Sequence, residues 1–242
     1  MGGSDEIEFH HRLDMLLIAH RGFHDRRIAE NTLEAFRRAV MQGADAIEFD
    51  LRLSRDGVPV VIHDENLHRI AGDSRRVRDL TAKDLGEVAL RGRGNIPTLN
   101  EITAAIPAPT QFDIEVKDRK ALQILITKLH TSAALRRRTI ISSFVISDLS
   151  LVAKEVPDVR TLFLQRTWPL PLRRRAFLKK LTVARVWGVG FPFNILNKRR
   201  VAWLREKGFA VAAWDLQSLR RQARRVSNLG VDAGIVYRID SV

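Results

Sequence analysis

Two carboxylates and a histidine lie close together in one short stretch of the chain, residues 46–64, AIEFDLRLSRDGVPVVIHD. Glu48 and Asp50 alternate with apolar residues. Because a β-strand places every second side chain on the same face, the two carboxylates share one face. The dipeptide Asp56–Gly57 predicts a hairpin turn, and the apolar run after it ends in His63–Asp64. This spacing of acidic and imidazole groups indicates a functional site.

A second alternating stretch, residues 111–117, QFDIEVK, repeats this arrangement. Its polar face carries Asp113, Glu115 and Lys117. An unpaired carboxylate that is buried costs several kcal/mol, so something positive is expected to meet these groups. Arg52 and Lys117 are candidates for that partner. Three converging carboxylates also form a cage of hard oxygen ligands for one divalent cation, Mg²⁺ or Ca²⁺, and the set expected here is Glu48, Asp50 and Glu115.

Two histidines occupy positions where proton transfer would be useful. His20 ends an apolar run and precedes Arg21, and His63 precedes Asp64. A single histidine is more often structural than functional. A pair of histidines beside a metal, with Arg21 and Lys117 as cations, suits phosphate-ester chemistry. The metal and the cations would neutralise phosphoryl oxygens, while the imidazoles would transfer protons to and from the ester oxygens.

Short apolar runs alternate with helical periodicities along the chain and predict the elements that hold these residues. Strands are expected within residues 15–22, 46–64, 111–117, 139–144, 161–165, 186–191, 210–214 and 233–237. Helices are expected at residues 33–43, 99–106, 121–135, 147–155, 172–181, 198–207 and 218–229. Eight such units predict an α/β fold, a closed (β/α)₈ TIM barrel, with an open doubly wound sheet as the alternative. In a barrel, polar residues at the strand ends would line the active site.

Two regions fall outside this alternation. Residues 1–14 form a polar, acidic tail that we expect to be disordered or left over from cloning, with residues 15–242 as a single barrel domain. Residues 65–97 predict a short excursion after the second strand, passing over the barrel mouth, with a helical turn at residues 81–89. The tail does not look like a signal peptide, and no apolar run approaches the roughly 20 residues of a membrane span. We therefore expect a cytoplasmic protein, either free or peripheral to a membrane.

Charge is unevenly distributed along the chain. The net charge is +13, with a balance of −5 over residues 1–118 and +18 over residues 119–242. The basic half contains Arg136–Arg138, Arg173–Arg175 with Lys179–Lys180, Lys198–Arg200, Arg220–Arg221 and Arg224–Arg225. Such runs could bind an anionic lipid surface or an acidic protein, or simply face solvent. Nucleic acid is disfavoured because aromatic residues do not interleave with the basic runs. The absence of cysteine excludes disulfides, thiolate metal sites and cysteine nucleophiles.

Several short motifs occur together in a characteristic order. They are His20–Arg21–Gly22, Glu30–Asn31–Thr32, Gly43–Ala44–Asp45, Glu48-x-Asp50, Asp56–Gly57, His63–Asp64, Leu67-x-Arg69, Ile96–Pro97–Thr98–Leu99 and Ile114–Glu115–Val116–Lys117. In this combination the chain resembles the glycerophosphodiester phosphodiesterase family. The specific likeness covers residues 16–117. Beyond them it consists chiefly of the β/α rhythm, with Val211-x-x-Trp214 and Gly230–Val231–Asp232.

The resemblance implies a TIM barrel and a role for each motif residue. Glu48, Asp50 and Glu115 would bind one divalent metal, His20 and His63 would be the acid/base pair, and Arg21 and Lys117 would hold the phosphate. Supporting residues would be Glu30, Asn31 and Trp214. The family reaction hydrolyses a small-molecule glycerophosphodiester to glycerol 3-phosphate and an alcohol. It implies attack by the neighbouring glycerol hydroxyl on phosphorus, and then opening of a cyclic phosphate by water. These are hydrolases of lipid and glycerol metabolism.

Two late segments depart from the family pattern. The family usually has Trp-Thr-x-Asn after the seventh strand, where this chain has Trp214–Asp215–Leu216–Gln217. The family's Thr-Asp-x-Pro near the end is replaced by Val236–Tyr237–Arg238–Ile239. Because the catalytic set is intact, these departures concern substrate choice and the closing edge of the barrel.

Two alternatives to the leading function stay open from the sequence. One is a lysophospholipase D-like activity, since Trp168–Leu172 may border the mouth, and basic residues mix with Phe177, Leu178 and Leu181 in the helix that follows. That mixture could rest on anionic lipid, or the helix could be an ordinary outer helix of the barrel. The other alternative is a non-catalytic barrel whose basic half binds an acidic partner.

Overall fold

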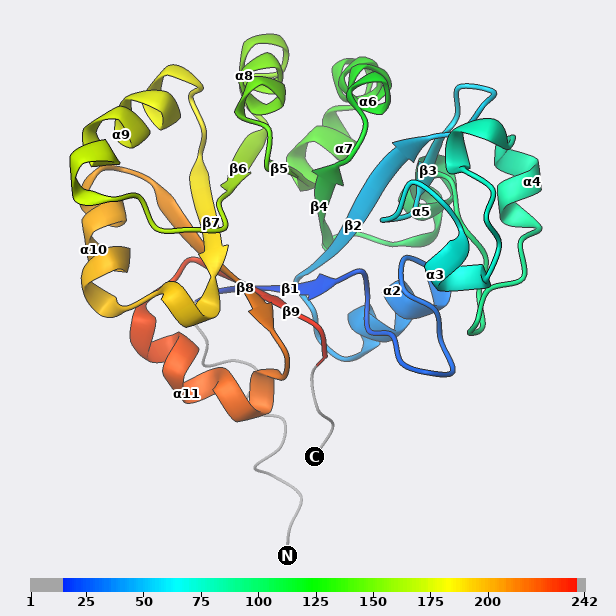
Figure 1. The fold of residues 1–242 in the computed structure, drawn as a ribbon, viewed down its shortest axis with the longest axis horizontal. Helices are drawn as coiled ribbons and strands as arrows, with labels where there is room; N and C mark the ends of the chain where they lie inside the picture. Colours follow the sequence, from blue (N-terminus) through cyan, green and yellow to red (C-terminus); the bar gives the residue numbers. More distant parts are fainter. Residues whose placement is uncertain (1–14, 239–242) are drawn as a thin grey trace, which may run out of the picture.

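Eight parallel strands close into a barrel in the computed structural model, which describes residues 15–238 (Figure 1). The strands are β1 Leu16–His20, β2 Ala46–Leu53, β4 Gln111–Val116, β5 Thr139–Ser143, β6 Arg160–Leu164, β7 Gly188–Pro192, β8 Ala210–Leu216 and β9 Ala233–Val236. Closure is complete because β1 pairs in parallel with both β2 and β9. The predicted (β/α)₈ TIM barrel is therefore confirmed, and the open doubly wound sheet is excluded.

Helices cover the outside of the barrel (Figure 1). They are α2 Leu33–Met41, α5 Leu99–Ala105, α6 Arg119–Thr131, α7 Ala133–Arg138, α8 Ile146–Glu155, α9 Arg174–Val183, α10 Lys198–Glu206 and α11 Leu219–Leu229, with the 3₁₀ turns η3 Pro171–Arg173 and η4 Phe193–Ile195. Several begin at a polar residue whose side chain accepts a backbone N–H: Thr32 for α2, Thr98 for α5, Asp118 for α6 and Asn197 for α10. The side chains of Arg220, Arg221 and Arg224 lie outside the described residues.

The single helix predicted over residues 121–135 is wrong, because the structure has two helices, α6 and α7, separated by Ser132. The backbone of Ser132 is extended, with φ −126° and ψ 95°, so it ends α6. Its side chain then accepts the N–H of Leu135 and caps α7. The apolar periodicity continues across Ser132, and for that reason the sequence pattern predicts a single helix.

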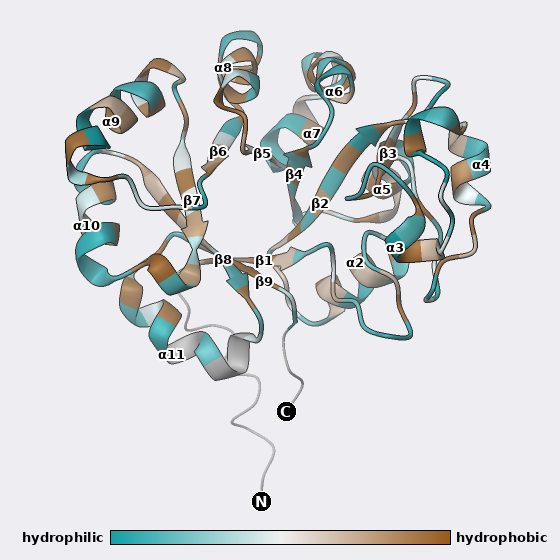
Figure 2. Cartoon of the chain, in the orientation of Figure 1, coloured by the Kyte–Doolittle hydropathy of each residue, from teal (hydrophilic) through white to brown (hydrophobic). Residues whose placement is uncertain are grey.

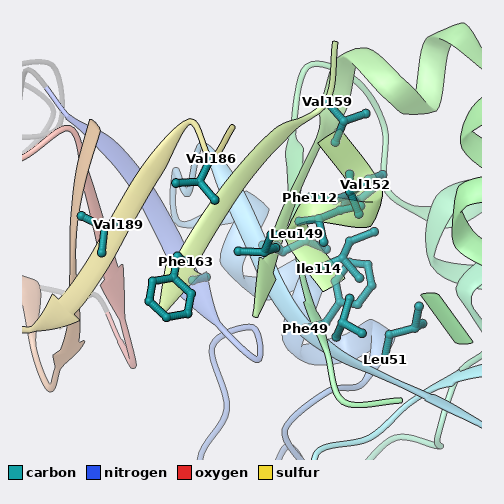
Figure 3. Packing of buried hydrophobic residues seen from close by; sticks show 14 of the residues in the cluster. Phe49, Leu51, Phe112, Ile114, Leu149, Val152, Val159, Phe163, Val186 and Val189 are labelled. Carbon is teal, nitrogen blue, oxygen red and sulfur yellow. The ribbon is translucent and has the colours of Figure 1, made fainter. Parts of the chain in front are cut away.

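The two faces of each strand have different surroundings. Ile47, Phe49 and Leu51 of β2 are buried in the core between the strands and the helices. Figure 3 shows Phe49 and Leu51 of β2 with Leu149 and Val152 of α8. The intervening residues of β2 point into the barrel, and Figure 2 shows hydrophilic and hydrophobic residues alternating along this strand. A smaller apolar cluster inside the barrel consists of Ile18, Ala46, Ile140, Leu162, Leu164, Ala212, Ala233 and Ile235.

The excursion after the second strand is confirmed in its position along the chain. The hairpin that precedes it ends in β3 Pro59–Val61, antiparallel to β2, and the excursion contains α3 His68–Ala71, η2 Val77–Asp79 and α4 Ala82–Gly86. Its apolar residues Leu67, Val77, Leu80, Leu85, Val88 and Ile96 form a separate buried cluster with Val60 and Ile62 of the hairpin. The excursion lies beside β2 and β3 (Figure 1), and none of residues 65–97 lines the cavity described below, contrary to the sequence expectation. Because the excursion is mostly polar in composition, its six buried apolar residues are not evident from the sequence.

Residues 1–14 and 239–242 lie outside the described part of the chain, so the predicted tail stays a prediction. Within residues 15–238, none of the helices combines the length and the apolar character needed to cross a bilayer.

Candidate active site

A cavity of about 290 Å³ opens among the carboxyl ends of the barrel strands. Its lining includes seven of the residues predicted from the sequence: His20, Arg21, Glu48, His63, Glu115, Lys117 and Trp214. Asp50 is fully buried beside them, and its partners include Asn31. Glu30 reaches the site through Arg21. The barrel thus brings all ten predicted residues into one neighbourhood, although they come from β1, β2, β4, β8 and the loops that follow.

The three predicted metal ligands lie on adjacent strands. Glu48 and Asp50 belong to β2, and Glu115 of β4 is the register partner of Asp50. One oxygen from each of the three carboxylates can be chosen so that all lie within 4.8 Å of one another. All three side chains are buried. This geometry follows from the alternation of each strand together with the parallel register.

The electrostatics of these carboxylates indicate a missing positive charge. Burial raises the pKa of Glu48 well above its usual range, and the charges of Asp50 and Glu115 add to the effect. Burial and the charge of Asp50 also raise the pKa of Glu115. The Oε1 atom of Glu48 is buried without a hydrogen-bond partner. Because such groups normally have partners, this donor set fits one hard divalent cation, which would relieve the repulsion.

Asp50 is held in place from three sides. Asn31 donates from Nδ2 to Asp50 Oδ2 at 2.9 Å, Arg21 Nε lies 3.1 Å from the same oxygen, and Lys117 Nζ lies 3.2 Å from Oδ1. Burial opposes ionisation of Asp50, but the charges of Arg21 and Lys117 prevail and lower its pKa. Lys117 Nζ also lies 2.5 Å from Glu115 Oε1. The two predicted phosphate-binding cations therefore already face the acidic cluster.

The loop after β1 adopts an uncommon backbone conformation. Arg21 and Asn31 have φ values of 54° and 58°, in the left-handed region that costs non-glycine residues about 1–3 kcal/mol each. Gly22 is required in this loop, since a Cβ there would lie 2.6 Å from the backbone of Ala35 in α2. The close packing lets the Arg21 N–H donate to Glu48 Oε2 at 2.9 Å. Such strain persists where the surrounding structure fixes a functional geometry.

His20 stands at the edge of the acidic cluster. Its Nε2 atom lies 3.9 Å from Glu48 Oε2, and its Nδ1 atom is buried without a partner. Burial lowers the pKa of His20 to about 3, and the charge of Arg21 acts in the same direction. A neutral imidazole of this kind can accept a proton. The ring of Tyr237 lies against it, with 4.4 Å between the ring centroids.

His63 is held by a chain of charged groups. Its Nδ1 atom lies 2.6 Å from Asp64 Oδ1, and Arg69 donates from Nε to Asp64 Oδ2 at 2.6 Å. Arg69 also donates to Glu30, which accepts from Arg21 at 2.9 Å. The excursion thereby contributes Arg69 to the site and links the two histidine-bearing segments. Burial lowers the pKa of His63, while Asp50 and Asp64 oppose that change.

Several lining residues do not follow from the sequence motifs. They are Asp113, Ser142, Phe144, Leu164, Arg166, Asp215, Ile235 and Tyr237. Asp113 has a signal in the sequence, because it alternates with Glu115 on the same strand face. Burial raises its pKa to about 7, and the nearby Ser142 hydroxyl acts in the opposite direction. Asp215 and Tyr237 stand out in the sequence only as departures from a family pattern.

The opposite side of the cavity is largely aromatic. Phe144 and Trp214 meet edge to face, with 6.0 Å between ring centroids. The Arg166 guanidinium lies 4.4 Å from the centroid of the Phe144 ring. Trp168, which was expected to border the mouth, instead packs on Phe191 at 5.1 Å and is not among the lining residues. Its indole also packs against Trp203 of α10, with 5.7 Å between the ring centroids, because burial of a large apolar ring is favourable.

Comparison with known proteins agrees with this geometry. The model of the glycerophosphoryl diester phosphodiesterase family matches residues 20–241. The chain is 31% identical over 240 residues to the glycerophosphodiester phosphodiesterase of Caldanaerobacter subterraneus subsp. tengcongensis, covering 91% of this chain and 93% of that protein. It is 33% identical over 143 residues to "Probable glycerophosphodiester phosphodiesterase 2" of Mycobacterium tuberculosis, covering 59% of this chain and 53% of that protein, about half its length.

A solved structure shows the same likeness in three dimensions. The glycerophosphodiester phosphodiesterase of Thermotoga maritima superposes with a TM-score of 0.73 at 27% identity, covering 92% of this chain and 94% of that one. The family match spans nearly the whole of the described barrel, including every residue of the acidic cluster and both histidines. The chain therefore belongs to the glycerophosphoryl diester phosphodiesterase family, a family of phosphoric diester hydrolases.

Proposed function

We propose that this protein hydrolyses small glycerophosphodiesters to glycerol 3-phosphate and an alcohol, with one divalent cation, Mg²⁺ or Ca²⁺, held by Glu48, Asp50 and Glu115. The observation that carries the proposal is the meeting of these carboxylates with His20 and His63 in one cavity. When bound, the cation would supply positive charge to the phosphoryl oxygens. Family membership favours this enzyme over the non-catalytic barrel that binds an acidic partner.

The residues of the site suit a reaction in two steps. Arg21 and Lys117 would hold the phosphate, and binding of substrate would loosen their contacts with Asp50. As the glycerol hydroxyl next to the phosphate attacks phosphorus, one imidazole takes its proton. The other imidazole donates a proton to the headgroup oxygen as that P–O bond breaks, which leaves a cyclic phosphate. Water then opens the ring with the proton transfers reversed, and glycerol 3-phosphate is formed.

Glu30, Asn31 and Trp214 would support this chemistry without taking part in it. Asn31 orients Asp50, and Glu30 joins Arg21 to Arg69. Trp214 lines the cavity opposite the charged groups. We place the whole reaction at this cavity, inside one barrel domain. The cytoplasmic location expected from the sequence stays a prediction, which fractionation of cells expressing the full chain would test.

The test is the release of glycerol 3-phosphate by His20→Ala and His63→Ala variants. Since general acid–base catalysis contributes about 100- to 10,000-fold, each variant should lose that much of kcat while keeping its circular dichroism spectrum. His68→Ala is the matched control, because His68 lies on α3 and does not line the cavity. Full activity in both variants would reject the assignment of the acid/base pair.

A second candidate is action on a lysophospholipid at an anionic membrane surface. Leu172 and Leu170 are 98% and 65% exposed, and they lie between β6 and α9, next to the exposed cations Arg173 and Arg175. Exposed apolar residues flanked by cations suit an anionic bilayer. The apolar residues expected for this role on the helix itself do not fit it, because Phe177 and Leu181 are buried in the core.

Sedimentation with liposomes tests the lipid surface. The wild-type protein should sediment with vesicles containing anionic lipid at low salt and remain in solution with neutral vesicles. Leu172→Asp should weaken sedimentation, whereas Met41→Asp, at a position 80% exposed on α2, should leave it unchanged. Absence of binding to anionic vesicles at low salt would end this candidate without affecting hydrolysis of soluble diesters.

A further inference from the structure

The two segments that depart from the family pattern meet at the mouth of the cavity. Tyr237 follows β9 and Asp215 lies near the end of β8, and the Tyr237 hydroxyl donates to Asp215 Oδ1 at 3.2 Å. Both residues line the cavity, and the Tyr237 ring also packs on His20. Two changes that are distant in the sequence therefore form one structural feature beside the proposed catalytic pair. Ile239, in the second of these segments, lies outside the described residues.

The backbone directs Asp215 toward the cavity. The pairing of β8 with β9 shifts register between Ala213 and Leu216, and Asp215 has a φ of 64°. A register irregularity at a strand end re-aims the side chain that it carries, and such irregularities are frequent beside active sites. Aspartate tolerates the left-handed region better than most non-glycine residues, so the strand end can hold this backbone conformation with the carboxylate at the cavity.

Asp215 faces an opposite charge across an aromatic surface. Asp215 and Arg166 both line the catalytic cavity and a second groove of about 470 Å³ that adjoins it. Arg166 lies over Phe144, which meets Trp214, the residue before Asp215. Among the side chains that the structure describes, which leave out those of residues 219–221, 223 and 224, Asp215 accepts from the Tyr237 hydroxyl and Arg166 lies over the Phe144 ring. A carboxylate and a guanidinium therefore both line the cavity that a ligand would enter.

We infer that this wall, consisting of Phe144, Arg166, Trp214, Asp215 and Tyr237, is the leaving-group subsite and that it favours a zwitterionic, amino-acid-type headgroup such as serine. The inference rests on the proposed function, which places the phosphate at Arg21 and Lys117 on the opposite side. The leaving alcohol then extends over the wall, with its ammonium group beside Asp215 and its carboxylate beside Arg166. Tyr237 is a positioning residue that orients the Asp215 carboxylate.

Headgroups with other charges can pair with at most one of the two charged residues of this wall. A choline or ethanolamine headgroup pairs with Asp215 but leaves Arg166 without an anion. A glycerol headgroup pairs with neither charge. Because Asp215 and Arg166 are exposed, each pairing is expected to change kcat/KM by about tenfold rather than by orders of magnitude.

The experiment compares kcat/KM for glycerophosphodiesters with serine, ethanolamine, choline and glycerol headgroups. The wild-type enzyme should prefer the serine diester over the glycerol diester by about tenfold or more. Asp215→Asn should lower this preference about tenfold and lower the ethanolamine and choline preferences similarly. Arg166→Gln should lower the preference for the serine diester over the glycerol diester and leave the preferences for the ethanolamine and choline diesters unchanged. Tyr237→Phe keeps the ring on His20 but removes the hydroxyl, so it should lower the serine preference by a smaller factor.

The control is Glu87→Gln, which removes an exposed carboxylate outside the cavity and should leave every ratio unchanged. Equal preferences in the wild type, Asp215→Asn and Glu87→Gln would overturn the inference, while turnover of the glycerol diester would keep the proposed function. No turnover of any diester by the wild type with Mg²⁺ or Ca²⁺ would reject the proposed function and the inference together. If Asp215→Asn does not fold, the ratios of Arg166→Gln and Tyr237→Phe decide the matter.

Discussion

The two sides of the cavity are built in different ways. The charged side, from residues 20–117, consists of buried groups that hold one another: Asp50, for example, contacts Asn31, Arg21 and Lys117. The aromatic side, from residues 144–237, carries two exposed charges, Asp215 and Arg166, which contact the Tyr237 hydroxyl and the Phe144 ring. Chemistry requires groups fixed before the substrate arrives, whereas selection of a headgroup requires groups still available to it. Under the proposed function, this difference separates the residues that would carry out the reaction from those that would select the headgroup.

The largest effect should come from breaking the charged side. Glu115→Gln removes one of three converging oxygens, and because outer contacts of a metal site are already worth about 10- to 100-fold in affinity, losing a ligand should cost about 100-fold or more. Turnover should fall in parallel. Glu101→Gln, a carboxylate of α5 outside the cavity, is the matched control. Unchanged cation affinity in Glu115→Gln would show that the acidic cluster is not the metal site.

A smaller effect is expected where the excursion supports the charged side. Asp64→Asn keeps the shape of the residue but removes the negative charge beside His63 Nδ1. Without that partner the ring can adopt the wrong tautomer, so kcat should fall about 10- to 100-fold and the pH–rate profile should shift. Asp73→Asn, in the same excursion but outside the cavity, should change neither. A change in KM alone, with kcat and the pH–rate profile unchanged, would contradict this role for Asp64.

A third prediction concerns stability rather than rate. Burial raises the pKa of Asp113 to about 7, so the folded protein keeps this proton up to neutral pH, whereas the unfolded chain releases it near pH 4. Stability is therefore lost as pH rises from about 4 to 7, and the penalty is complete above pH 7. Without added metal, Asp113→Asn should raise the free energy of unfolding by up to about 4 kcal/mol at pH 8 and by much less at pH 5.

Urea denaturation at both pH values measures this effect. A variant that is less stable than the wild type at pH 8, or a difference that does not depend on pH, would show that the carboxylate of Asp113 is favourably solvated inside the barrel. That result would also indicate that water reaches the charged side of the cavity, although its residues are buried from bulk solvent.

The charged side could be predicted from the sequence because its signals are local. Alternation places Glu48 and Asp50 on one strand face, and the parallel order of a barrel brings Glu115 beside them. Asp64 and Arg69 belong to two neighbouring motifs, His63–Asp64 and Leu67-x-Arg69, although the contact of Arg69 with Glu30 depends on how the excursion folds back. The periodicity of residues 121–135 could not reveal the break at Ser132, since apolar spacing does not record where a side chain caps a helix.

The aromatic side could not be predicted in the same way. Phe144, Arg166 and Tyr237 follow three different strands and Trp214 lies within a fourth, β8, so no short-range pattern relates them. The contact between Asp215 and Tyr237 needs both the closure of the barrel and the register shift of β8 on β9. Burial of Phe177 and Leu181 is similar, because only the packed helix shows which of its faces meets the strands. Residues that are distant in the sequence and meet only in the folded structure produce no recognisable local sequence pattern.

Calorimetric titration of the full chain with Mg²⁺ or Ca²⁺, paired with glycerol 3-phosphate release before and after chelation, tests the central claim most directly. The acidic cluster predicts one saturable cation per chain in the wild type, weakened in Glu115→Gln, and catalysis that disappears with chelator and returns with the cation. Undiminished turnover in chelator, or the same cation affinity in both proteins, would contradict a catalytic cation held by Glu48, Asp50 and Glu115.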